Sequence, residues 1–409
     1  MPSRTVGQKS GKNASKRGKK PVMYRLAPVG SQQRKPKPRQ APRVPAPAIS
    51  LTSTDSPALG PDKAGSSGWK EVVQRYISLY NQAETEQHAE GVRSFVKDSD
   101  HCARLGSRLQ RLRDRDLYRG AVSLYSETKA ELARVNESPS EVAVLLKLHI
   151  RRKMEQNGTG YTEERAEYER LWLDRKDGEW AINRIEPVIG ERRPRYGSMA
   201  DAWIADIEAD QRGYNRPGRG GGTTPYLNYD LFPQFKIRTA AIPYRRDLAV
   251  AYADRWWNAA NPNFELFEVN CTNYISQCLY AGNAPLDYTG RRESGWWYKG
   301  RTGGREWWSY SWAVSNALTQ YLSLPRKSGL RAEIVYDPEL LELGDVITYD
   351  WNGDNRFQHS AIVTAFDANG MPLVNANTVP SRHRYWDYRD SYAWTEQTKY
   401  RFFHIADYM

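Results

Sequence analysis

Hydrophobic residues recur every three or four positions from Trp69 onward, where the apolar part of the chain begins. The recurring set is Trp69, Val72, Val73, Tyr76, Ile77 and Tyr80. This spacing places one apolar stripe along a helix, so the sequence predicts an amphipathic helix here. A second helical stretch is predicted to run through Phe95 to about Leu112.

Four segments with the character of strands follow these helices. They are residues 127–135, 141–151, 164–174 and 179–188. Turn-forming residues separate them, notably residues 136–139, Asn157-Gly158 and Asp177-Gly178. Two helices followed by an antiparallel meander predict an α+β layer, in which the helices cover one face of a curved sheet.

The last part of the chain returns to a helical pattern. A helix is expected from Tyr244 to about residue 258. The next helix is expected at 270–282, with Gly282 as its stop, and this places Cys271 in the first turn. Two antiparallel strands are then predicted at residues 359–366 (HSAIVTAF) and 371–378 (MPLVNANT).

Two segments of biased composition divide the chain. Residues 1–67 are rich in Lys, Arg, Pro, Ser and Gly, so they cannot bury enough apolar surface to offset the entropy of ordering, and we expect a disordered basic tail. Residues 193–240 are rich in Gly, Pro and Arg and are expected to be a linker with a short helical patch at 198–210. The predicted folded domains are therefore 68–192 and 241–409.

Net charge suggests which partners the chain could bind, and the sequence features for export or membrane insertion suggest its compartment. The 409 residues contain 60 Lys and Arg against 48 Asp and Glu, a formal net charge of +12, and much of the excess lies in the tail. The tail could contact a polyanion, although a solvated extension is the simpler interpretation. The sequence shows neither a signal peptide nor a membrane span, so we expect a cytoplasmic protein, with cell-wall or spore association as the alternative.

Cys271 is the candidate nucleophile. The thiolate is the reactive form of cysteine, and the partial positive charge at a helix N-terminus stabilises it. Backbone N–H groups of the same turn can also bind a developing oxyanion. The alternative, a buried small hydrophobe, fits Cys278 better, because Cys278 lies on the apolar face of the same helix. With Cys102, the chain has three cysteines, too few for a disulfide framework.

His359 is the candidate base, because an imidazole titrates in the range needed to accept the thiol proton and to protonate the leaving amine. Asn375 and Asn377 lie two residues apart on the neighbouring strand, so both can point to one face. Either could orient the imidazole through its amide oxygen, which would complete a Cys-His-Asn constellation.

The remaining polar and aromatic candidates are assigned structural roles or left open. Structural roles are expected for His101, Cys102, His149 and Asp345, a solvated loop for His383, and a packed or paired side chain for His404. Six tryptophans could line a groove or fill the core: Trp296, Trp297, Trp307, Trp308, Trp312 and Trp351. No metal site and no cofactor is predicted.

Six motifs follow one another along the C-terminal part. They are Tyr244-Arg-x-x-Leu-Ala-x-x-Tyr-Ala-x-x-Trp256, Cys271-Thr-Asn-Tyr-Ile-Ser-Gln277, Ser311-Trp312, Gly344-Asp-Val-Ile-x-Tyr349, His359-Ser-Ala-Ile-Val363 and Asn377-Thr378. In this order they resemble the bacterial putative amidase domain family, a branch of the papain-like cell-wall hydrolases that includes CHAP-type amidases. The resemblance implies a papain-like α+β fold, with Cys271 as nucleophile and His359 as base. Relatives commonly have Asp where this chain has Asn270, and often His at Asn377.

The hairpin YERLWLDRKDGEWAINRIEPV carries a second resemblance, which covers residues 69–189. This region resembles the cystatin-like cone fold of the nuclear-transport-factor superfamily. That fold carries binding, dimerisation and catalytic roles alike, so it assigns no activity.

The leading expectation is a cysteine-dependent amidase or peptidase that acts on amide bonds in peptidoglycan or its peptides. The amide specificity is implied by the resemblance, because a Cys-His pair also suits thioester or acyl-transfer chemistry. The alternative is a non-catalytic binding or assembly protein that uses the basic tail and the cone-fold domain to engage a polyanion or a partner.

Overall fold

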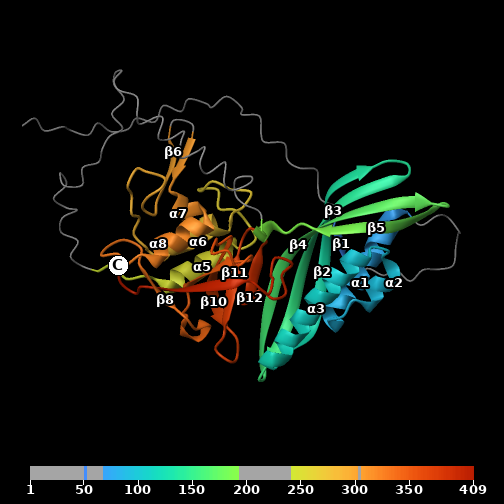
Figure 1. Ribbon diagram of the computed structural model, residues 1–409, viewed down its shortest axis with the longest axis horizontal. Coiled ribbons are helices and arrows are strands. Elements are labelled where there is room, and N and C mark those ends of the chain that lie inside the picture. The colour runs from blue at the N-terminus through green and yellow to red at the C-terminus, as the bar shows by residue number, and fades with distance from the viewer. Residues whose placement is uncertain (1–49, 53–67, 193–240, 303–304) are drawn as a thin grey trace, which may run out of the picture. The chain divides into compact units, whose positions relative to one another are not determined.

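The computed structural model describes residues 50–52, 68–192, 241–302 and 305–409. The expected linker with its helical patch, and the expected tail apart from strand β1 (Ser50–Thr52), lie outside the described residues. Figure 1 shows the arrangement of the described elements. None of the described helices is long and apolar enough to span a membrane.

Three helices open the described part of the chain: α1 (Trp69–Glu86), α2 (Glu90–Phe95) and α3 (Ser99–Arg119). The first predicted helix is confirmed, and the second predicted stretch is divided into α2 and α3. The division arises at Asp98, whose carboxylate accepts the N–H of His101 at 2.9 Å and so caps the start of α3. The helix ends at Gly120, which has a φ of 65°.

The four predicted strands are confirmed as β2 (Ala121–Glu137), β3 (Glu141–Gln156), β4 (Thr159–Lys176) and β5 (Glu179–Pro187). The first three are longer than predicted, and β5 ends one residue before its predicted end. Asn157-Gly158 and Asp177-Gly178 all have positive φ, as two-residue hairpin turns require. The helices lie on one face of this sheet, as predicted (Figure 1). Their apolar residues form a single core with those of the strands.

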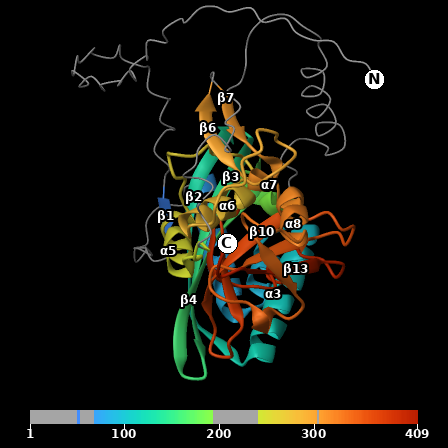
Figure 2. The ribbon, with the colours of Figure 1, turned by 90° about the vertical axis from the view of Figure 1, so that its left-hand side faces the viewer.

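The C-terminal part contains helices α5 (Arg246–Trp256), α6 (Cys271–Ala281), α7 (Tyr310–Ala313) and α8 (Ser315–Ser323). Its strands are β6 (Tyr298–Thr302), β7 (Arg305–Trp308), β8 (Ala332–Val335), β9 (Val346–Asp350), β10 (His359–Phe366), β11 (Pro372–Ala376), β12 (Ser381–Tyr385) and β13 (Lys399–Ile405). Two short 3-10 helices are η1 (Gly190–Arg192) and η4 (Pro338–Leu340). The predicted helices around 244–258 and 270–282 and the antiparallel pair β10–β11 are confirmed. Figure 2 turns these elements toward the reader.

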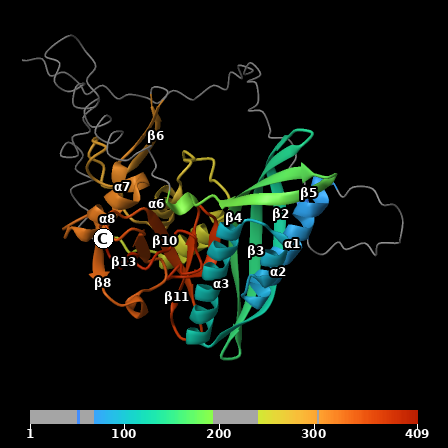
Figure 3. The same cartoon turned by 45° about the vertical axis from the view of Figure 1, so that its right-hand side comes forward.

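One antiparallel sheet runs through both parts of the chain in the order β1-β2-β3-β4-β12-β11-β10-β9-β13-β8, with β5 also paired to β4. The two parts meet where β4 pairs with β12, through Arg165 opposite Ser381 and Glu164 opposite Arg382. Figure 3 shows α3 beside the C-terminal strands. The α+β class is confirmed, whereas the boundaries 68–192 and 241–409 stay predictions, because the strands of both regions share one sheet within the compact unit 47–409.

The C-terminal part of the sheet is covered on both faces. On the face toward α6, Val346, Ile362 and Phe403 pack with apolar residues of that helix. On the opposite face, Ile347, Tyr349, Trp351, Ala361, Val363 and Tyr388 form a separate cluster. These two faces, called here the α6 face and the opposite face, decide which candidate residues can meet.

Candidate active site

Cys271 is the first residue of α6, and its side chain is buried with 2% of its surface exposed. The backbone N–H groups of Asn270 and Cys271 both donate to Thr378 Oγ1, at 3.0 and 2.7 Å. Thr378 lies in the turn 377–380 between β11 and β12. The helix N-terminus thus presents two converging N–H donors, and a hydroxyl oxygen already occupies the point where they meet.

Asparagine side chains hold this end of α6. The Asn270 amide donates to Asn377 Oδ1 at 2.6 Å, and Asn270 Oδ1 accepts from Asn273 at 2.8 Å. The Asn377 amide nitrogen in turn donates to the carbonyls of Trp256, Trp257 and Ala259, at 2.9, 2.9 and 3.2 Å. Asn377 therefore connects the end of α5 to the start of α6. The two positions at which this chain departs from the amidase pattern, 270 and 377, contact each other.

The structure does not bring His359 to Cys271. Ser360, the next residue along β10, faces α6, where its hydroxyl lies 3.3 Å from Thr272 Oγ1. Successive side chains of a strand point to opposite faces, so His359 lies on the opposite face. Its ring is surrounded there by Tyr349, Trp351 and Tyr388, with ring centroids 5.5, 5.8 and 5.3 Å away.

The surroundings of His359 favour a neutral imidazole. Its Nε2 lies 3.4 Å from the Tyr388 hydroxyl, and Nδ1 has no hydrogen-bond partner among the described residues. Burial lowers the pKa of His359 to about 3, and the positive charge of Arg384 acts in the same direction. This imidazole has the environment of a core residue.

The two candidate orienting residues also bind other partners. Asn375 Oδ1 accepts from the Thr364 hydroxyl at 2.8 Å and from the His383 N–H at 2.9 Å, and its amide nitrogen donates to Asp254 at 3.0 Å. Neither Asn375 nor Asn377 forms a hydrogen bond with His359 among the described contacts. The Cys-His-Asn constellation remains a prediction that this conformation does not assemble.

His383 and His404, the histidines of the C-terminal part that were not assigned to catalysis, both lie close to a carboxylate. His383 was expected in a solvated loop, but it lies on β12 with Nε2 3.5 Å from an Asp254 oxygen, because β12 continues the sheet to β4. His404 is paired as predicted, with Nδ1 2.9 Å from Asp345, and this hydrogen bond raises the pKa of His404. Asp345 also accepts the N–H of Glu342 at 2.8 Å, which fits its predicted role in the turn.

The remaining candidates occupy structural positions. His101 Nε2 lies 3.2 Å from the Tyr76 hydroxyl, and His149 stacks on Trp257 at 6.0 Å. Burial raises the pKa of Cys102, and raises that of Cys278 well above its ordinary value. Five of the six tryptophans are buried, which favours the core interpretation for them: Trp296, Trp297, Trp308, Trp312 and Trp351.

Residues 243–403 match the family described as "Putative amidase domain". The uncharacterized protein YhbB of Bacillus subtilis (strain 168) is 41% identical over 260 residues, which cover 63% of this chain and 78% of that protein. The chain belongs to this amidase family. The uncharacterized protein YjcM of the same organism is 28% identical over 138 residues, which cover 31% of this chain and 29% of that protein.

Among solved structures, the intermembrane space region of chloroplast protein ARC6 has a TM-score of 0.22 and 14% identity. The likeness covers 29% of this chain and 93% of that chain. The family match, in contrast, indicates amide hydrolysis, and so a hydrolase, as the activity class of residues 243–403.

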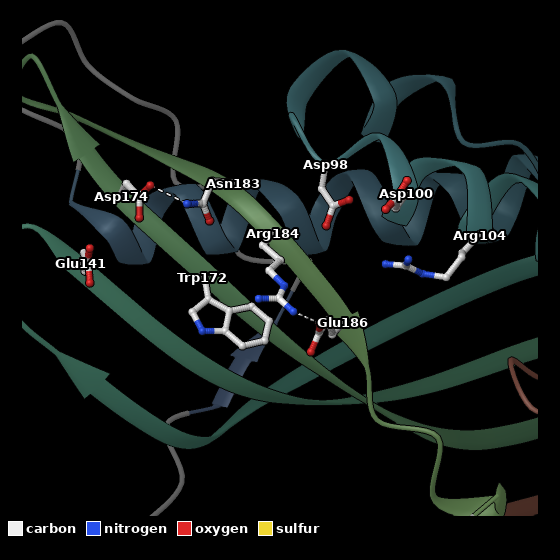
Figure 4. A pocket seen from close by; sticks show the side chains of 9 residues that line it. All are labelled: Asp98, Asp100, Arg104, Glu141, Trp172, Asp174, Asn183, Arg184 and Glu186. Atoms are coloured by element: carbon white, nitrogen blue, oxygen red, sulfur yellow. Dashed lines mark hydrogen bonds and ion pairs between the residues drawn. The ribbon is translucent and has the colours of Figure 1, made fainter.

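An open hollow of about 600 Å³ lies outside the amidase domain, between the start of α3 and strands β4 and β5 (Figure 4). Its walls carry five carboxylates, those of Asp98, Asp100, Glu141, Asp174 and Glu186. Asp174 binds Asn183 and Glu186 binds Arg184 within the hollow. No predicted site residue lines it. Across the described residues, no cluster of three or more His, Cys, Asp or Glu could hold a metal ion.

Thr378 is the site residue that sequence reasoning missed. It stands one residue after Asn377, in the last of the six motifs, but a threonine in a turn has no local signal for contact with a distant helix. Ser360 was missed for a similar reason. Strand alternation predicts that Ser360 and His359 point to opposite faces. Only the contact with Thr272 shows that Ser360 is the residue on the α6 face.

Proposed function

We propose that the amidase domain hydrolyses amide bonds with Cys271 Sγ as the nucleophile. The observation that carries this proposal is the convergence of the Asn270 and Cys271 N–H groups on one oxygen atom at the start of α6. Two N–H donors in this arrangement can hold the oxyanion that forms when a thiolate attacks an amide carbonyl.

The reaction would proceed through a thioester. Sγ attacks the carbonyl carbon, the carbon–nitrogen bond breaks, and the amine leaves with a proton. Water then releases the acid and restores the thiol. We propose amides of peptidoglycan stem peptides as the substrate class, and the support for this is the resemblance of the six motifs to cell-wall hydrolases.

A second function, amide binding without turnover, is favoured by one specific observation. The one hydrogen-bond partner of Cys271 Sγ among the described residues is the Thr272 hydroxyl, at 3.8 Å. A hydroxyl is not a base at neutral pH, and the His359 ring is on the opposite face of the sheet. If the proton acceptor does not reach Sγ, the fold would bind an amide and leave it intact.

The test compares the purified full chain with Cys271→Ala on peptidoglycan and on small peptide amides, with mass spectrometry of the products. We expect release by the wild type and a loss of about a thousandfold or more in the variant, as for the removal of a covalent nucleophile. Cys278→Ala is the matched control on the same helix and should keep the activity. Equal release by wild type and Cys271→Ala would refute the nucleophile, and binding without release would favour the second function.

A further inference from the structure

The turn 377–380 touches both the Cys271 helix and the region 68–192. On one side, Thr378 Oγ1 accepts the N–H groups of Asn270 and Cys271. On the other side, the Pro380 carbonyl accepts the N–H of Ala166, on β4, at 2.7 Å. We propose that this turn is a gate that closes the Cys271 site, and that residues 68–192 set its position. This deepens the proposed function and rests on it for its meaning in catalysis.

The site is closed in this conformation for two separate reasons. The oxyanion of an attacked amide would have to accept the N–H groups that Thr378 Oγ1 already occupies. The Cys271 side chain is also only 2% exposed, so a peptide cannot approach Sγ. A substrate carbonyl must therefore displace the Thr378 hydroxyl, and the turn must move before the thiol can react.

The turn is also held from the region before the linker, in addition to its contacts with the start of α6 and the end of α5. β12, which begins directly after the turn, pairs with β4 through Ser381 and Arg165. Gly190, in η1, lies against the turn so closely that an added Cβ would be 3.0 Å from Val379 Cγ2 and 3.6 Å from Thr378 Cγ2. A shift of β4 or η1 would therefore be transmitted to Thr378. This gives residues 68–192 a role in controlling access to the thiol.

The experiment measures alkylation of each cysteine of the full chain by iodoacetamide, read by peptide mass spectrometry. In Thr378→Val, Cys271 should react about tenfold faster, because the loss of the two hydrogen bonds opens the gate by roughly that factor. Thr378→Ser keeps the hydroxyl and should react like the wild type. Cys278 lies two turns further along α6 in the core, so its protection shows that the fold is intact.

Gly190→Ala tests the link to the region 68–192, since residue 190 is not part of α6. Its new methyl group would push on Val379, and Cys271 should again react several-fold faster while Cys278 stays protected. Unchanged Cys271 rates in both Thr378→Val and Gly190→Ala, with Cys278 protected, would overturn the gate. If Cys278 becomes reactive in Thr378→Val, the core of that variant is not intact, and the result for Gly190→Ala alone then tests the gate.

The two proposals fail in different ways. If the alkylation rate of Cys271 rises in Thr378→Val and Gly190→Ala but amide release does not depend on Cys271, the gate is supported and the proposed hydrolysis is refuted. If amide release depends on Cys271 but the alkylation rate of Cys271 is unchanged in both variants, the hydrolysis is supported and the gate is refuted.

Discussion

His359 lies among three aromatic rings, fully buried on the face of the sheet away from α6. Burial lowers the pKa of His359 to about 3, whereas a histidine in an unfolded chain titrates near about 6.5. Between these values the unfolded chain binds a proton that the folded chain does not bind. Folding is therefore coupled to pH at this residue.

We predict that His359 makes the protein less stable as the pH falls from about 6.5 toward about 4, by up to roughly 1.4 kcal/mol per pH unit. His101 has the same sign, because burial lowers its pKa to about 4. Glu169 and Asp387 have the opposite sign, since burial raises their pKa values to about 7 and about 6, and their effect is to reduce stability as the pH rises. Urea titrations at several pH values should show that His359→Leu reduces the dependence of the free energy of unfolding on pH below about 6.5, by the equivalent of up to one proton taken up on unfolding.

The control for this measurement is His88→Leu, which also removes one histidine but from an exposed position, where His88 lies 3.2 Å from Glu86. An acid slope in His359→Leu equal to that of the wild type would contradict the assigned environment.

At the scale of elements, the end of α6 is fixed by a close approach to the start of α5. Gly282 follows the last helical residue, and a Cβ added there would clash with the Tyr244 ring and lie 3.0 Å from the Ala249 Cβ. Tyr244 cannot move freely, because its hydroxyl donates to the Gly344 carbonyl at 2.9 Å. The glycine that the sequence identified as a helix stop is also required for packing.

Gly282→Ala should destabilise the protein by about 1–3 kcal/mol in urea unfolding, the usual cost of an overpacked core. Gly106→Ala is the matched control within α3, where the added Cβ would have its nearest neighbour at 3.8 Å. That substitution should stabilise the protein by about 0.5–1 kcal/mol, because alanine favours a helix over glycine. Equal effects of the two changes would refute the packing argument.

Local patterns were enough to predict the helices and strands of residues 68–192 and, in the C-terminal part, α5, α6, β10 and β11, because helix and strand periodicities act over a few residues. They could not show which way His359 points. The first six residues of β10 are all buried, so the alternation of polar and apolar residues that marks the face of a half-exposed strand is lost. The pairing of β4 with β12 joins Arg165 to Ser381, positions too distant in the sequence for any local signal. The position of Thr378 depends on that pairing, so the sequence could not predict that its hydroxyl closes the Cys271 site.

At the scale of the whole chain, buried ion pairs join the region 68–192 to the amidase domain. Asp390 is fully buried and lies 3.1 Å from Arg115, 3.2 Å from Arg384 and 3.9 Å from Arg165. Arg119 adds a pair to Asp367 at 3.1 Å. Burial alone would raise the pKa of Asp390, but the nearby guanidinium groups of Arg384 and Arg115 hold it well below its ordinary range. The contribution of this carboxylate is thus complete above about pH 4 and is lost as the pH falls further.

Asp390→Asn should destabilise the full chain by about 3–5 kcal/mol at pH 7, because it removes a buried negative charge that Arg384 and Arg115 share and leaves an excess of buried positive charge. Asp247→Asn is the control, since its partner Arg245 is exposed and the pair should contribute little.

Because β4 and β12 belong to one sheet, both regions should unfold in a single transition. Tryptophan fluorescence and hydrogen exchange of peptides from each region would test this. If the amidase domain kept its protection in Asp390→Asn while residues 68–192 lost theirs, the two regions would be separate folding units and the shared sheet would not couple them.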